Sequence, residues 1–292
     1  MKSERSSDTA FRTLLVLGGI AVSVLLIAIF VSLTVAARPA IIANGFRFLT
    51  GSEWDPVTSS FHSLAFVVGT LITSLIALVV ATILSLALAI LMGEYFRTGA
   101  FSAIMRTAVE LLAGIPSVVY GFIGLFFFVP AVRVLETVLG LPPFGVGMLT
   151  TSLLLAFMIL PYSASIGREI ISLVPSDLKE AALSLGATQS ETIWKITLPY
   201  ATSGIMGGVL LSLGRALGET MAVTMVIGNA NVLTFDIFAP GNTMASVIAN
   251  EFSEATTNVY LSRLIEIGLL LFVVSTLINI AGKIVVNRMA AR

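Results

Sequence analysis

Two charged side chains, Arg215 and Glu219, lie near the middle of an otherwise apolar segment, residues 201–228. A charge at the centre of a bilayer costs at least about 2.5 to 3.5 kcal/mol on insertion scales, so such residues usually face a protein interior or a water-filled cavity. Four residues apart on one helix, the two side chains would share a face and pair. One interpretation is an anion pathway, in which the planar guanidinium binds an oxyanion. The other is that the two charges only neutralise each other between packed helices.

Three polar residues follow the charged pair and are candidates for the same pathway. They are Thr220, Thr224 and Asn229. Hydroxyl and amide groups donate hydrogen bonds to an anion without adding charge. In the anion-pathway interpretation Arg215 contacts the anion, and Glu219 either holds Arg215 in place or accepts a hydrogen bond from a protonated oxyanion.

The sequence lacks the usual arrangements for catalysis and metal binding. There is no cysteine and His62 is the only histidine, so neither a thiolate nucleophile nor a metal cluster is expected. An intramembrane hydrolase would need an H-E-x-x-H zinc motif, a serine with a histidine base, or paired aspartates within the spans. A phosphate-binding loop is absent too, because the only Gly-Lys pair, Gly282-Lys283, is followed by Ile284. We therefore expect no catalytic residues, no metal and no cofactor in this chain.

The composition predicts an all-α integral membrane protein with six transmembrane helices. The 292 residues are 57% hydrophobic and 11% charged, with a mean hydropathy of +1.03, whereas soluble domains contain about 25% charged residues. A spanning helix needs about 20 mainly apolar residues. The segments that meet this requirement are residues 13–37, 63–93, 111–132, 148–167, 201–228 and 261–282. The net charge of zero gives no basic surface for nucleic acid.

The distribution of basic residues orients these spans. If the N-terminus is cytoplasmic, the inner segments hold most of the 16 lysines and arginines. These inner residues are Lys2, Arg5, Arg12, Arg97, Arg106, Arg168, Lys179, Lys195, Lys283, Arg288 and Arg292. The positive-inside rule therefore predicts that both termini are cytoplasmic. The first span is longer than the apolar region of a signal peptide, which has about 7 to 15 residues, so we expect it to be retained.

The longest cytoplasmic connection, residues 168–199, carries a helical pattern. Ser176 is expected to cap a helix that begins at Asp177. Apolar residues then recur at helical spacing as far as Gly186, which favours a left-handed cap. A second short helix follows, and Pro199 is expected to prevent regular helix from continuing at the membrane surface. The pattern alone leaves two interpretations open: a rigid projection, or a pair of helices lying on the lipid surface.

This connection resembles the EAA loop of ABC importer permeases over its full pattern. The matching residues are Glu180, Ala181, Ala182, Gly186, Ile196, Leu198 and Pro199. In that family the loop is a coupling helix that docks in a groove of a cytoplasmic ATPase subunit, so the resemblance implies this role for residues 177–199. It also implies the MetI-like fold of type I importers, with ATP bound and hydrolysed by separate subunits.

Further motifs resemble those of PstC-type permeases, which belong to phosphate-specific ABC importers of the bacterial inner membrane. They lie at residues 114–121, 214–223, 226–229, 240–242 and 249–252. The resemblance implies a phosphate importer in which this chain pairs with a PstA-type permease, two ATPase subunits and an extracytoplasmic phosphate-binding protein. It divides the chain into an N-terminal part (1–62), a permease domain (63–285) and a tail (286–292).

Two alternatives remain open at this point. The chain could serve an importer of another oxyanion, such as sulfate, molybdate or tungstate, because in this class a separate binding protein supplies most of the selectivity. A channel or carrier that works without ATPase subunits is a second alternative. Such a protein would have no use for a coupling helix, which the pattern of residues 177–199 resembles.

Overall fold

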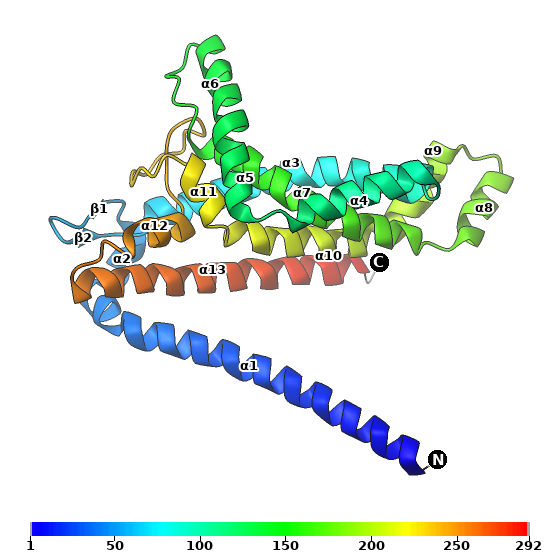
Figure 1. Ribbon diagram of the computed structural model, residues 1–292, viewed down its shortest axis with the longest axis horizontal. Helices are drawn as coiled ribbons and strands as arrows, with labels where there is room; N and C mark the ends of the chain where they lie inside the picture. Colours follow the sequence, from blue (N-terminus) through cyan, green and yellow to red (C-terminus); the bar gives the residue numbers. More distant parts are fainter. Residues whose placement is uncertain (1, 291–292) are drawn as a thin grey trace.

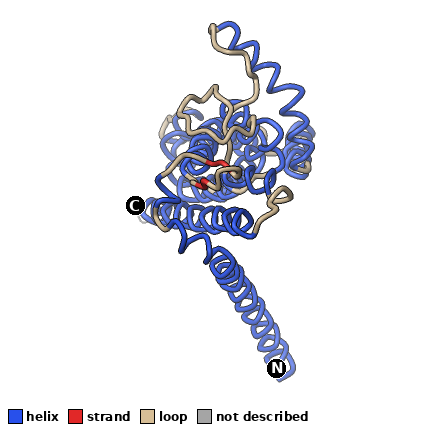
Figure 2. Tube along the Cα trace, turned by 90° about the vertical axis from the view of Figure 1, so that its left-hand side faces the viewer, coloured by secondary structure: helices blue, strands red, loops and turns tan. Residues whose placement is uncertain are grey.

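Four long helices run side by side and form the centre of the molecule (Figure 1). They are α3 (Leu64–Ile90), α7 (Met148–Ser172), α10 (Leu198–Leu217) and α13 (Asn258–Ala290). The structure is a computed structural model and describes residues 2–290. Helix α7 packs against both α3 and α10, while α13 packs against α10 and against α1 (Lys2–Asn44). Towards its N-terminal end α1 diverges from the other helices (Figures 1 and 2).

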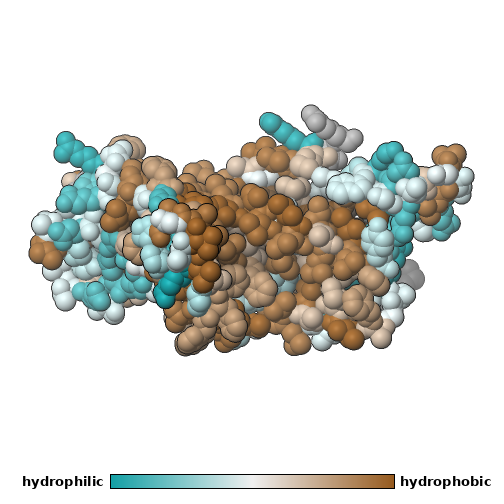
Figure 3. All heavy atoms as spheres, turned by 90° about the horizontal axis from the view of Figure 1, so that it is seen from above, coloured by the Kyte–Doolittle hydropathy of each residue, from teal (hydrophilic) through white to brown (hydrophobic). Residues whose placement is uncertain are grey.

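The predicted number of spans is confirmed within residues 2–290, where six helices are long and apolar enough to cross a bilayer. They cover Phe11–Ala43, Leu64–Tyr95, Ser117–Val138, Met148–Ser172, Gln189–Leu217 and Asn258–Met289. A helix satisfies its backbone hydrogen bonds internally, as a lipid environment requires. On the face shown in Figure 3, apolar side chains form a broad central band with hydrophilic residues at both ends.

Small side chains line the most extensive helix contact, between α3 and α7. Ala77 and Ala81 of α3 are at most 1% exposed and pack with Ala156 and Ile159 of α7. In lipid there is little hydrophobic drive to bring helices together, so association depends on close van der Waals packing, which small residues permit. The bulky apolar side chains of α3, such as Leu75 and Ile83, point outward and are more than half exposed.

The third predicted span, residues 111–132, is wrong in its boundaries because a proline divides it. Helix α4 (Ala100–Gly114) ends before Pro116, and Ile115 is extended, with φ −66° and ψ 130°. Proline sterically disfavours helical geometry in the residue before it. The actual span begins with α5 (Ser117–Ile123) and continues through the π-turn η2 (Gly124–Phe128) and α6 (Val129–Val138).

The fifth predicted span, residues 201–228, is not one helix. Helix α10 ends at Leu217, Gly218 is its C-cap, and a separate short helix, α11 (Met221–Val226), begins after Thr220. Glycine is among the poorest helix formers, and Thr220 precedes α11 with φ −112° and ψ −64°. The spanning helix instead starts earlier, at Gln189.

The two ends of the bundle carry different structures. At one end project α8 (Ser176–Ser184) and α9 (Gln189–Thr192), and α1 begins and α13 ends on the same side (Figure 1). We call this the loop end. At the opposite end, the hairpin end, lie α2 (Arg47–Thr50), the antiparallel strands β1 (Trp54–Asp55) and β2 (Ser60–Phe61), and α12 (Met244–Glu251).

An aromatic cluster and one carboxylate hold the hairpin end together. Trp54 stacks edge-on against Phe61 and Phe66 at centroid distances of 5.0 and 5.1 Å. Glu251 accepts hydrogen bonds from Trp54 Nε1 at 2.7 Å and from the Tyr260 hydroxyl at 2.6 Å. Its other oxygen accepts from Asn231 Nδ2 at 2.9 Å. The hairpin, α12, α13 and the long segment before α12 are thereby joined through one side chain.

Candidate functional site

Arg215 lies in the last turn of α10, and its guanidinium has free donors. The guanidinium carbon is 4.6 Å from the centroid of the Tyr162 ring, a cation–π contact with α7. The side chain is exposed, and within residues 2–290 it makes no hydrogen bond or ion pair. Five N–H groups on a planar fork are therefore available to an anion.

The predicted ion pair between Arg215 and Glu219 is not formed among the described residues. The reason is the end of α10 at Gly218, which removes the one-turn spacing that would bring the two side chains together. Glu219 instead accepts from the backbone N–H of Ala222, at 3.4 Å, in the first turn of α11. Carboxylates are favoured at helix N-termini because the unpaired N–H groups there carry partial positive charge. The interpretation in which the two charges simply neutralise each other therefore loses its geometric basis.

The three polar candidates lie along α11: Thr220 directly before it, Thr224 within it and Asn229 just after it. The Thr224 hydroxyl donates to the Thr220 carbonyl at 2.8 Å, and Asn229 Nδ2 donates to the Thr224 carbonyl at 3.0 Å. Asn229 has a positive φ of 51°, which asparagine tolerates better than most residues. The Thr220 hydroxyl donates to the Gly218 carbonyl at 3.2 Å. Hydrogen bonds thus link Asn229 to Thr224 and Thr224 to Thr220, and Thr220 lies at the break between α10 and α11.

Tyr162 belongs to this site although the sequence reasoning did not include it. Its hydroxyl donates to the Ala113 carbonyl at 2.7 Å, and the Tyr120 hydroxyl donates to the neighbouring Leu112 carbonyl at 2.6 Å. The last four carbonyls of a helix have no partner within it, so the two tyrosines satisfy the end of α4. The ring under Arg215 is thereby fixed at both its face and its hydroxyl. A tyrosine within an apolar span was the signal that could have indicated it.

The predicted two-helix projection at residues 168–199 is present, with Gly186 between the helices at φ +89°. The predicted cap at Ser176 is wrong, since Ser176 is already the first residue of α8 and no side chain caps that helix. A capping box does start α9, where Thr188 and Glu191 bond each other's backbone N–H groups. Gly186 allows the left-handed turn that a residue with Cβ rarely adopts.

The predicted end of helix at Pro199 is also wrong. Helix α9 continues through the π-turn η3 (Ile193–Thr197) into α10, with Pro199 in the first turn of α10. Proline removes one backbone donor and clashes with the carbonyl four residues earlier. A π-turn contains an extra residue and shifts that carbonyl, so the helix passes the proline without stopping.

The residues of the EAA pattern divide into an exposed group and an anchoring group. Glu180, Ala181 and Gly186 are exposed on the projection. Leu198 is 9% exposed and packs in an apolar cluster with residues of α3, α7 and η3. The remaining members, Ala182 and Ile196 (partly buried) and Pro199 (exposed), complete the pattern.

Exposed apolar side chains accompany the exposed group. Leu183, Leu185 and Trp194 are 48%, 91% and 63% exposed. Exposed apolar residues that lie close together mark a surface that contacts either another protein or the membrane.

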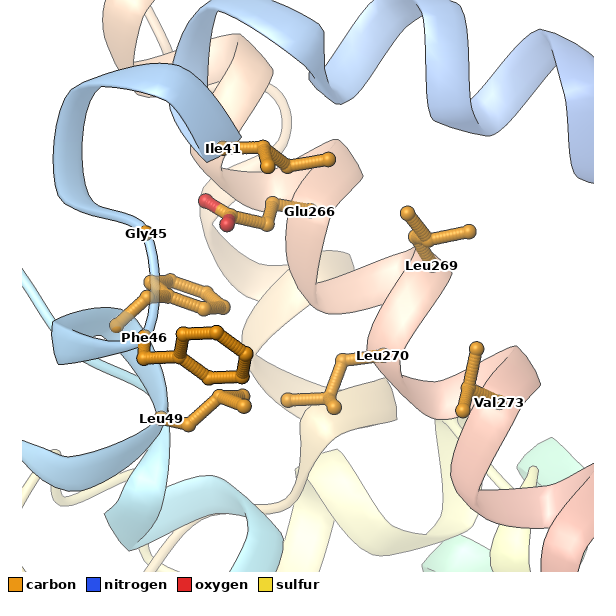
Figure 4. A pocket seen from close by; sticks show the side chains of 9 residues that line it. Ile41, Gly45, Phe46, Leu49, Glu266, Leu269, Leu270 and Val273 are labelled. Atoms are coloured by element: carbon orange, nitrogen blue, oxygen red, sulfur yellow. The ribbon is translucent and has the colours of Figure 1, made fainter.

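An apolar groove near the hairpin end does not suit an anion. A groove of about 270 Å³ lies between the end of α1, α2 and α13, and its lining is almost entirely apolar (Figure 4). The one carboxylate that lines it, Glu266, is bound to Arg263 at 2.9 Å. The polar residues around the end of α10 are therefore the better candidate for a solute pathway.

Comparison with known proteins identifies the family. The family described as "Binding-protein-dependent transport system inner membrane component" matches residues 85–291. This chain belongs to that family. Phosphate transport system permease proteins PstC of Mesorhizobium japonicum and Pasteurella multocida are each 42% identical to it, over 98% and 91% of this chain and 92% and 88% of theirs. The probable PstC of Methanocaldococcus jannaschii is 35% identical over 84% of this chain and 83% of its own length.

A solved structure shows the same fold. A chain of the MetNI methionine ABC transporter, in an inward-facing conformation, superimposes with a TM-score of 0.56. The match covers 76% of this chain and 93% of that one, at 17% identity. The fold is therefore that of ABC importer permeases, as the EAA pattern predicted, and the chain is a multi-pass permease subunit of the inner membrane.

Proposed function

We propose that this chain is a transmembrane permease subunit of an ATP-driven phosphate importer. The observation that carries the proposal is the similarity to PstC proteins along almost the whole chain, at up to 42% identity. Phosphate at neutral pH is a divalent or monovalent oxyanion, and the exposed Arg215 guanidinium offers the planar donors that suit it. The importer takes up phosphate from the side of the hairpin end.

The pathway in this proposal passes the break between α10 and α11. Arg215 contacts the anion, and Thr220, Thr224 and Asn229 donate or accept hydrogen bonds as it passes. Glu219, bound to the start of α11, accepts a hydrogen bond from a protonated phosphate oxygen. Sulfate, which is unprotonated at neutral pH, lacks that donor and is rejected.

The partners follow from the same proposal. The α8 projection docks on one of two ATPase subunits, which bind and hydrolyse the ATP, because this chain has no phosphate-binding loop of its own. A PstA-type permease completes the pathway as a heterodimer, and an extracytoplasmic phosphate-binding protein delivers the anion. The loop end, with both termini, faces the cytoplasm, and the chain carries no cofactor or metal.

The deciding experiment measures uptake of labelled phosphate in cells with and without this chain, with sulfate and molybdate as competitors. We expect loss of high-affinity phosphate uptake on deletion, restoration by the wild-type chain and no restoration by Arg215→Ala. If deletion leaves phosphate uptake unchanged but abolishes uptake of another oxyanion, the chain is still an importer subunit and phosphate is refuted as its cargo. Uptake that persists without an ATPase partner would refute the importer itself.

A further inference from the structure

Lys179 is a buried lysine on a helix whose other side chains are mostly exposed. Its side chain is only 9% exposed, and its Nζ lies 2.6 Å from Glu94 Oε1 and 3.4 Å from the Ile171 carbonyl. Lysine is almost never buried unless its charge is paired. Within residues 2–290, Lys179 is the one side chain of α8 that hydrogen-bonds outside that helix.

Glu94 sits in the π-turn η1 (Leu91–Tyr95), which directly continues α3. Its side chain is 7% exposed and accepts from two cations, Lys179 at Oε1 and Arg97 at Oε2, the latter at 2.8 Å. Arg97 is held in turn by a bond from its Nε to the Gly93 carbonyl at 2.9 Å. Both carboxylate oxygens are therefore engaged, and η1 is joined to α8 across 85 positions of sequence.

The α8 projection has few other contacts with α3 and η1. Its main neighbours are α9 and η3, which begin the spanning helix that continues into α10. Beside the ion pair a cleft of about 390 Å³ separates η1 from α8 and α9. Within residues 2–290, the one side-chain hydrogen bond from α8 to η1 is thus this buried, charge-assisted contact, and such contacts are stronger and more directional than neutral ones.

Helix α3 extends from this ion pair to the hairpin end. There the Thr70 hydroxyl accepts from the backbone N–H of Met244, the first residue of α12, at 3.0 Å. At Gly69 the helix lies so close to the Asn242 carbonyl that a Cβ atom would be only 2.1 Å from its oxygen. One continuous helix therefore touches the α8 projection at one end and the segment that precedes α12 at the other.

From these contacts we propose that Lys179 and Glu94 are positioning residues that transmit movement of α8 to α3, and through α3 to the hairpin end. The proposal rests on the proposed function, in which a partner ATPase moves α8. Glu94→Gln leaves the buried charge of Lys179 without an ionic partner. Lys179→Gln leaves Glu94 paired with Arg97 alone and removes the charge-assisted bond between η1 and α8. Exchange of the charges at positions 94 and 179 restores the pair only together with Arg97→Glu, because an unchanged Arg97 would repel a lysine at position 94.

The experiment uses the complete complex, with both permeases, the ATPase subunits and the binding protein, in proteoliposomes. The variants are Glu94→Gln, Lys179→Gln and the exchanged variant Glu94→Lys/Arg97→Glu/Lys179→Glu, in which all three charges of the cluster are reversed. Lys283→Gln, an exposed lysine of α13, is the matched control. The readout is the number of anions transported per ATP hydrolysed, measured on complexes purified through a tag on the ATPase, so that only assembled complexes are counted.

We expect each single variant to lower this ratio about tenfold, the scale of one lost hydrogen bond to a charged group, and the control to leave it unchanged. The exchanged variant should recover at least half of the wild-type ratio. A wild-type ratio in either single variant, or no recovery in the exchanged variant, would overturn the proposal. If a single variant does not assemble, the exchanged variant decides alone: recovery of assembly without recovery of the ratio counts against the proposal.

The cargo is tested separately from this link. If the wild-type complex transports another oxyanion in place of phosphate, the cargo proposal fails, and the ratio is measured with that oxyanion. Only the comparison between the single and exchanged variants tests whether Lys179 and Glu94 transmit movement from α8 to α3.

Discussion

At the residue scale, Arg215 is held by the Tyr162 ring and not by a carboxylate. A cation–π contact contributes about 0.5 to 2 kcal/mol, enough to fix the guanidinium while leaving all of its N–H donors free. A bound carboxylate would occupy those donors and compete with an incoming anion. The arrangement therefore suits a site that binds and releases an oxyanion.

Substitutions of Arg215 test this arrangement directly. We expect Arg215→Ala to reduce phosphate uptake more than about a hundredfold and Arg215→Lys more than about tenfold, because an ammonium group lacks the planar fork. The measurement is the initial rate of labelled phosphate uptake at equal amounts of assembled complex. A wild-type rate in either variant would exclude Arg215 from the pathway.

Tyr162 allows the ring and the hydroxyl to be separated. Tyr162→Phe retains the face beneath Arg215 and loses the bond to the Ala113 carbonyl, whereas Tyr162→Leu loses both. We expect the apparent KM for transport to rise about tenfold in Tyr162→Leu and only about two- to threefold in Tyr162→Phe. Equal effects of the two variants would show that the ring does not position Arg215.

At the element scale, the turn between α8 and α9 depends on a left-handed residue. A Cβ at Gly186 would meet no atom within 4 Å, so any effect of substitution comes from the backbone conformation alone. We expect Gly186→Ala to destabilise the turn by about 1 to 2 kcal/mol and to weaken co-purification of the ATPase. Gly186→Asn should do so less, since asparagine adopts this conformation more readily; equal co-purification of Gly186→Ala and wild type would contradict the prediction.

The contact of α3 with the hairpin end also depends on a glycine. Alanine at Gly69 would place its Cβ against the backbone oxygen of Asn242, which no side-chain rotation can relieve. We expect Gly69→Ala to cost about 1 to 3 kcal/mol and to lower the midpoint of thermal unfolding in detergent by about 5 °C. Gly207→Ala, in α10 with open space around the added Cβ, is the control and should not lower the midpoint.

At the scale of the whole molecule, the even number of spans places the start of α1 and the end of α13 at the same end as α8 (Figure 1). Because the chain has no cysteine, single cysteines report the orientation cleanly. We expect Ser52→Cys, before the hairpin, to react with a membrane-impermeant maleimide on intact cells. Asn287→Cys, near the end of α13, should react only after the membrane is opened; the reverse pattern would refute the proposed orientation.

Most of the architecture was predictable from the chain because lipid imposes simple rules on it. An apolar run of about 20 residues is long enough to cross a bilayer as a helix, which satisfies its own backbone hydrogen bonds. The predicted count of six therefore agrees with the six such helices among residues 2–290. The glycine at position 186 was predictable as a left-handed turn, since few other residues adopt it. The spacing of the EAA residues was sufficient to predict the family that the comparisons found.

Only the tertiary structure decided which polar groups meet. The charged pair at positions 215 and 219 appeared to share one helix, but the helix ends between them, and propensity is too weak a guide to locate such a break. Arg215 meets Tyr162 of α7, and Lys179 meets Glu94 across 85 positions. Contacts of this kind depend on how the helices pack. Packing depends on how the whole surfaces of two helices fit together, which the spacing of residues along one helix does not predict. Composition and spacing determined the spans and the family, whereas helix packing decided the partners of each buried charge.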